Sequence, residues 1–147
     1  MDIGELQDCG VERLEALYQE GEATSVPRGL FRGVYLERVP GARPLVPRVA
    51  EVIGFQLTPF WVDFDRRCWA FVHPRLAAGR FTAQVGASRW RDTTTVTMDY
   101  SVSRLPGPVR GMLYDEVKPL SDDLCLGFGG INRDRGDGEL FFFALRR

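Results

Sequence analysis

The sequence predicts a mainly β protein: an antiparallel β-barrel preceded by a helix and interrupted by a second short helix between its first two strands. From residue 66 onward, apolar and polar residues alternate with a period of two. Gly, Pro, Asn and Asp divide this stretch into short segments, and the connections are too short for the crossovers of a parallel sheet. Closing such strands into a barrel removes the exposed edges and leaves room for one small ligand.

Composition indicates one ordinary soluble domain over residues 1–147. The chain has 147 residues, 27% of them charged, and a formal net charge of -1. This balance argues against nucleic-acid binding, and no apolar run approaches the roughly 20 residues of a membrane-spanning helix. Acidic residues near the start are unlike a secretory signal, and the three cysteines are too widely spaced for a local disulfide or zinc site. We therefore expect a cytoplasmic protein.

The first 57 residues predict two helices and a strand. Residues 1–21 form an amphipathic helix that places Leu14 and Tyr18 on one face and ends at Gly21. Residues 29–37 are rich in apolar and aromatic residues and predict the first strand, where the barrel begins. The second helix is expected near 46–57, since apolar residues recur there at helical intervals.

Six further strands are expected, near 67–73, 79–88, 93–102, 109–118, 123–131 and 139–146. The clearest alternation places Met98 and Tyr100 on a buried face. The strand at 109–118 would place Arg110, Tyr114 and Glu116 on one side. Glycines within the strands are expected at bulges or bends of a curved sheet.

Two stretches resemble a known family. Residues 29–33 (GLFRG) look like the five-residue signature of the bacterial GXWXG domain, with Phe31 where that family has Trp. Residues 112–123 (MLYDEVKPLSDD), followed by Leu126-Gly127 and by FFFAL at 141–145, are similar to the domain that usually follows it. The resemblance spans about the first and last thirds of the chain. It implies a lipocalin-like, calycin-type barrel whose biochemical role is not established.

The leading functional hypothesis is a binding barrel for a small, largely apolar or amphipathic ligand, either fatty-acid-like or aromatic. Aromatic and sulfur-containing residues would contact its apolar part, and Arg110 with Tyr100 or Tyr114 would hold an acidic group, because a guanidinium grips a carboxylate bidentately. The alternative is that Arg110 and Glu116 form a solvated ladder outside the barrel. The predicted ligand-binding residues are Trp69, Phe71, His73, Met98, Tyr100, Arg110 and Tyr114.

The sequence also allows three other functional hypotheses. An isomerase or cyclase would use Asp115 or His73, since Asp115 alternates with apolar residues and is a candidate for a raised pKa. A structural hydrogen bond is the alternative role of Asp115. His73, the sole histidine, would serve as axial ligand if the barrel bound haem, or would be a rim residue if no cofactor is present. A filled barrel acting in a homodimer or scaffold is the third class, and no metal site is predicted.

Overall fold

The computed structural model describes residues 1–39, 59–131 and 139–147. Helices there are α1 (Ile3–Gln7), α2 (Val11–Gln19) and α4 (Gly107–Met112). The strands are β1 (Leu30–Arg38), β2 (Phe60–Asp63), β3 (Cys68–Phe71), β4 (Ala77–Arg80), β5 (Thr82–Ala87), β6 (Thr94–Asp99), β7 (Leu113–Pro119), β8 (Leu124–Ile131) and β9 (Glu139–Arg146). The helix expected near 46–57 lies outside the described residues.

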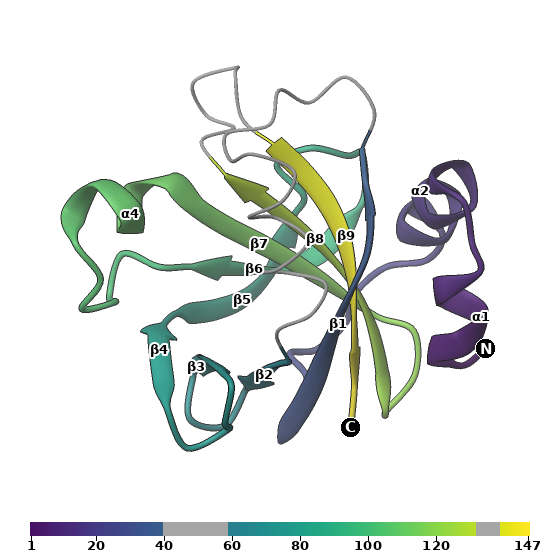
Figure 1. Ribbon diagram of the computed structural model, residues 1–147. Helices are drawn as coiled ribbons and strands as arrows, with labels where there is room; N and C mark the ends of the chain where they lie inside the picture. Colours follow the sequence, from purple (N-terminus) through teal and green to yellow (C-terminus); the bar gives the residue numbers. More distant parts are fainter. Residues whose placement is uncertain (40–58, 132–138) are drawn as a thin grey trace.

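The nine strands form one antiparallel sheet that curls into a nearly closed barrel (Figure 1). Their order is β4-β3-β2-β1-β9-β8-β7-β6-β5, so every ladder except β1–β9 joins strands that follow each other along the chain. The edge strands β4 and β5 are separated by Phe81 alone, whose N–H donates to the Arg67 carbonyl at 3.0 Å. The mainly β, antiparallel barrel predicted from the sequence is confirmed.

The N-terminal segment forms two helices, whereas the sequence predicts one continuous helix. Helix α1 begins with a capping box in which Asp2 and Glu5 satisfy each other's backbone N–H groups. It ends at Gln7, with Asp8 as its C-cap, and α2 starts after Gly10. Glycine has a high conformational cost inside a helix, which favours a break at this position.

Both helices cover the outer face of the barrel (Figure 1). Their apolar side chains meet residues that β8 and β9 direct outward, and Phe128 stacks on Phe142 with ring centroids 4.6 Å apart. This outer core contains Leu6, Leu14, Leu17, Tyr18, Leu124, Leu126, Phe128, Leu140, Phe142 and Ala144. The face of β8 and β9 that a bare barrel would expose to water is thereby buried.

Several strand boundaries differ from the prediction. Strand β2 follows Pro59, in a stretch where no strand was predicted, and the segment at 79–88 is divided into β4 and β5 at Phe81. The segment at 109–118 begins as helix α4, with Pro106 at its N-cap and Pro108 in its first turn, and becomes β7 only at Leu113. Proline at these positions favours a helix start over a strand.

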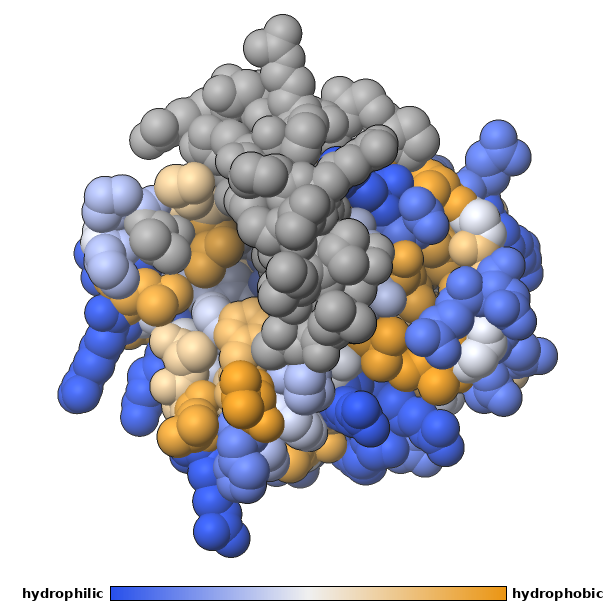
Figure 2. Space-filling model, viewed as in Figure 1, coloured by the Kyte–Doolittle hydropathy of each residue, from blue (hydrophilic) through white to orange (hydrophobic). Residues whose placement is uncertain are grey.

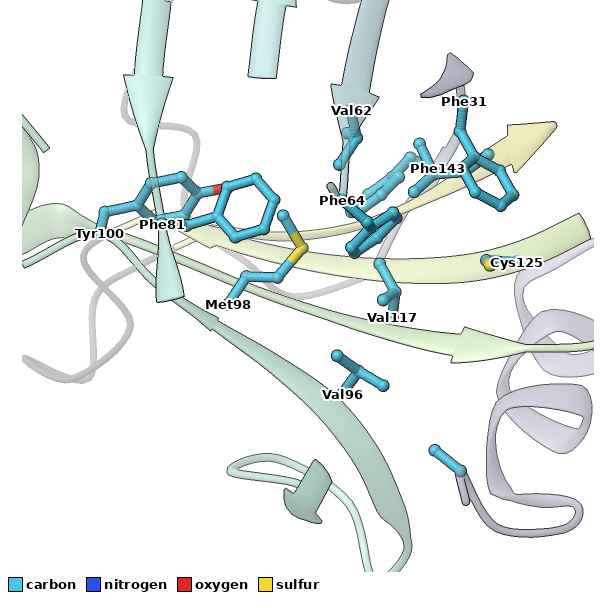
Figure 3. Packing of buried hydrophobic residues seen from close by; sticks show 12 residues of the cluster. Phe31, Val62, Phe64, Phe81, Val96, Met98, Tyr100, Val117, Cys125 and Phe143 are labelled. Atoms are coloured by element: carbon cyan, nitrogen blue, oxygen red, sulfur yellow. The ribbon is translucent and has the colours of Figure 1, made fainter. Parts of the chain in front are cut away.

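A second core fills part of the barrel interior (Figure 3). Side chains from β1, β2, β6, β7, β8 and β9 meet there, among them Phe31, Val62, Val96, Met98, Val117, Cys125 and Phe143. The predicted bulges at glycines do not occur along β8, which pairs with β7 and β9 without a shift of register. Instead, a Cβ at Gly127 would collide with the ring of Phe143, and a Cβ at Gly129 would collide with the ring of Phe141. Glycine at these two positions therefore lets both rings lie directly over the inner face of β8.

On the face shown in Figure 2, hydrophobic residues are set among hydrophilic ones. Among the described residues, no helix combines the length and the apolar character needed to cross a membrane.

Candidate functional site

One end of the barrel interior contains an apolar cavity of about 280 Å³. It lies between the last residues of β1, β3 and β6 and the first residues of β2, β7 and β9. Its described lining is Tyr35, Phe60, Val62, Trp69, Phe71, Met98, Tyr100, Leu113, Asp115, Gly130, Phe141 and Phe143. An engineered cavity of about 150 Å³ suffices for benzene, so this space suits a ligand of one or two small rings.

Aromatic rings make up most of the cavity wall. Trp69 and Phe71 from β3 meet edge to face with centroids 4.7 Å apart, and Trp69 reaches Tyr100 across the barrel at 6.4 Å. Phe60 contacts Phe71 at 6.2 Å and Phe143 at 6.0 Å. Contacts of Phe141 with Phe143 and with Tyr35 complete a continuous series of seven rings. Packed aromatic rings hold their orientations, so the cavity is built before a ligand enters.

Asp115 is the one ionisable carboxyl group among the described residues that line the cavity. It lies on the inner face of β7 opposite Met98 of β6, and the Tyr100 hydroxyl donates a hydrogen bond to Oδ2. A Cβ at position 129 would stand 2.8 Å from Oδ1, so the glycine at this position leaves room for the carboxyl group. Its position among apolar residues agrees with the alternation seen in the sequence.

Burial raises the pKa of Asp115 from its usual 3.8 to about 6. The hydrogen bond from Tyr100 opposes this rise, and the negative charge of Glu116 on the reverse face of β7 adds to it. Burial and the nearby Asp115 charge together hold the pKa of Tyr100 well above its ordinary value, so this phenol remains a donor. The pair can therefore present either a carboxylate or a carboxylic acid to a ligand near neutral pH.

Four of the seven predicted ligand-binding residues line this cavity: Trp69, Phe71, Met98 and Tyr100. His73 does not. It lies in the exposed turn after β3, because the strand ends at Phe71 and not at residue 73 as predicted, and its Nδ1 accepts a hydrogen bond from the Arg75 N–H at 3.1 Å. Val72, immediately before it, adopts a positive φ of 67°. This turn interrupts the strand geometry, so His73 does not lie on the same face of the sheet as Phe71.

Arg110 and Tyr114 also lie away from the cavity, and the predicted carboxylate-binding set does not assemble. Arg110 belongs to α4, where its guanidinium donates to the Ser103 carbonyl at 3.2 Å. Tyr114 lies on the outer face of β7, with the Arg89 guanidinium 3.6 Å from its ring centroid. The error follows from the helix at 107–112, which removes Arg110 from the strand face it was expected to share with Tyr114.

Glu116 is completely buried outside the barrel, neither in the cavity nor in a solvated ladder. Its Oε2 accepts hydrogen bonds from the Tyr18 hydroxyl at 2.7 Å and the Ser88 hydroxyl at 2.6 Å, and its Oε1 accepts from the Arg89 N–H at 2.6 Å. This carboxylate attaches α2 to the sheet. It therefore has a structural role beneath the helix.

Several lining residues were not predicted from the sequence, chiefly Tyr35, Phe60, Phe141 and Phe143. The run Phe141-Phe142-Phe143 carries a usable signal, because its alternate residues must face opposite sides of the sheet. Which rings meet across the interior depends on strand register, which single-strand alternation leaves undetermined.

A second hollow, of about 790 Å³, lies at the opposite end of the barrel and is more open. Arg28, Arg67 and Arg147 line it together with Asp65 and Asp122. The opposite charges on this solvated surface partly cancel each other's electrostatic field. We therefore consider this hollow a weaker candidate for a ligand-binding site than the smaller apolar cavity. In the described part of the chain, no cluster of three or more His, Cys, Asp or Glu residues is arranged to hold a metal ion.

Comparisons with known proteins support the fold. No protein-family model matches the chain, and no curated protein matches it significantly. A crystal structure of a protein from Thermomonospora curvata is similar, with a TM-score of 0.57 and 17% sequence identity, over 99% of this chain and 92% of that one. At this identity the likeness shows a shared fold alone.

Proposed function

We propose that this protein binds a small, largely apolar ligand inside the barrel. The observation that supports the proposal is the cavity itself, whose seven aromatic side chains surround about 280 Å³. A cavity of this kind, apolar with a few converging polar groups, is typical of small-molecule sites. A barrel that served only as a scaffold would gain stability by filling this space, since unfilled volume weakens a core.

We also infer that the barrel is of the lipocalin-like (calycin) type. Two observations support this: the strands follow an up-and-down order, with β1 paired to β9, and helices precede the barrel. The resemblance at residues 29–33 is consistent with it, because Phe31 lies buried in the inner core at the start of β1.

Methionine-methyl NMR tests ligand binding directly. Met98 lines the cavity, whereas Met1 is 61% exposed and provides an internal control. With 2-phenylethanol as probe, we expect a saturable shift of the Met98 methyl signal, an NOE from that methyl to the probe's ring protons, and no shift of Met1.

A cavity-filling variant tests whether binding occurs at this place. Leu113→Trp should abolish the Met98 response, because the larger side chain occupies the cavity. Leu30→Trp is the matched control, since Leu30 is exposed at the opposite end of β1 and should leave binding unchanged. Absence of the NOE in the unmodified protein, or unchanged binding in folded Leu113→Trp, would disprove the proposal.

A second candidate function, an isomerase or cyclase, is favoured by the Asp115–Tyr100 pair. A carboxyl group with a pKa of about 6 in an apolar site is suited to transfer protons near neutral pH. With 4-phenyl-2-butanone in D2O, such an enzyme would catalyse deuterium uptake at the carbons beside the carbonyl, and Asp115→Asn would abolish it. No catalysed uptake would leave the protein a binding barrel for this compound class.

A further inference from the structure

The charge distribution in the cavity restricts what can bind there. Among the described residues, the hydrogen bond that the Asp115 carboxyl group accepts comes from the Tyr100 hydroxyl and ends on Oδ2, not on Oδ1. No Arg, Lys or His is found among the described residues that line the cavity. The carboxylate is thus a negative charge without a counter-ion in that set of residues, and one oxygen is left for a donor from the ligand.

The other titratable groups near Asp115 do not neutralise its negative charge. Tyr35 on β1 and Tyr100 after β6 contribute phenol groups, and the raised pKa of Tyr100 keeps that phenol neutral. Glu116, on the reverse face of β7, adds a second negative charge. An anionic ligand would meet repulsion here, and a cationic one would neutralise the charge that the protein leaves uncompensated.

Aromatic walls also favour a positive charge. The face of each ring carries the negative part of its quadrupole, and cations over Trp, Tyr or Phe are attracted to it. Seven rings, six from β1, β2, β3 and β9 and the ring of Tyr100 directly after β6, surround the site. Trp69 contacts Tyr100, which donates a hydrogen bond to Asp115. A carboxylate enclosed by aromatic rings is the combination that recognises an organic ammonium group.

We infer that the ligand class is a small hydrophobic amine, bound as its ammonium ion, with N–H donated to Asp115 Oδ1 and its apolar part against the ring series. This inference rests on the proposed binding function and specifies its chemistry. The cavity of about 280 Å³ limits the ligand to one or two small rings or a short alkyl chain.

Three probes with the same phenyl group and different charge test the inference. Binding of 2-phenylethylamine, 2-phenylethanol and 3-phenylpropanoic acid is measured at pH 7.5 by calorimetry and by the Met98 methyl shift. We expect the amine to bind about tenfold more tightly than the alcohol, and the acid to bind more weakly than either. Amine affinity should fall as the pH drops below about 6, because the ammonium ion must then displace the Asp115 proton.

Asp115→Asn separates charge from shape. It keeps an acceptor for Tyr100 and should reduce amine binding to the level of the alcohol while changing alcohol binding little. Asp122→Asn, at an exposed position at the other end of the barrel, removes the same charge from the protein and should change neither.

The outcomes distinguish the two proposals. Equal binding of amine and alcohol, unaffected by Asp115→Asn, would overturn the amine inference and leave the binding barrel intact. Tighter binding of the acid would also overturn it. If none of the three probes shifts Met98, both the inference and the proposed function fail.

Discussion

Asp115 makes the stability of the protein depend on pH. The folded state raises its pKa from 3.8 to about 6, so the folded protein holds this proton more tightly than the unfolded chain does. Between about pH 4 and pH 6 unfolding releases a proton, and the contribution of this residue to the free energy of unfolding falls as pH rises. Above pH 6 the full penalty applies, up to about 3 kcal/mol at roughly 1.4 kcal/mol per pKa unit.

Asp115→Asn should therefore stabilise the protein at neutral pH. Urea unfolding from pH 4 to pH 8 should show the variant about 1–3 kcal/mol more stable above pH 7, with the difference disappearing toward pH 4. Asp122→Asn, which changes an exposed carboxylate, should lack this trend. A difference that stayed constant with pH would show that Asp115 does not titrate as described.

At the scale of elements, the attachment of α2 to the barrel combines apolar packing with buried polar contacts. Leu14 and Leu17 insert into the outer core, and Tyr18 reaches Glu116 on β7. Arg91 forms a two-pronged ion pair with Glu15, with Nε and Oε2 2.6 Å apart. Burial of such groups is costly unless each is satisfied, so these contacts define one position for the helix.

Glu116→Gln tests this attachment. The amide has one acceptor oxygen, whereas the carboxylate accepts three hydrogen bonds through two oxygens, so at least one donor among Tyr18, Ser88 and Arg89 loses its partner. We expect a loss of about 1–3 kcal/mol in the free energy of unfolding and faster hydrogen exchange of the α2 amides.

Glu12→Gln is the matched control for this prediction. Glu12 is exposed in the first turn of α2, so the substitution should cost only a few tenths of a kcal/mol. If both variants behaved alike, the buried carboxylate would not be what holds α2 in place.

At the scale of the whole molecule, the sequence predicted the barrel but not how its strands face each other. Alternation within one strand placed Met98 and Tyr100 inside and made Asp115 stand out among apolar neighbours, because strand geometry sets these faces locally. Arg110 was misplaced because a six-residue helix replaces the first part of an apparently alternating segment. The rings of β2 and β9 enter the cavity through pairing registers that the sequence of one strand does not encode.

The order of the strands also determines how the chain can fold. Seven of the eight ladders join consecutive strands and can form as two local meanders, β1–β4 and β5–β9. The eighth, β1–β9, pairs Arg32 with Arg146 and must close a loop of more than a hundred residues. Such closure is entropically costly and slow. Until the β1–β9 ladder forms, neither the aromatic wall of the cavity nor the outer core is complete. Its formation joins the two meanders into one sheet and encloses the barrel interior.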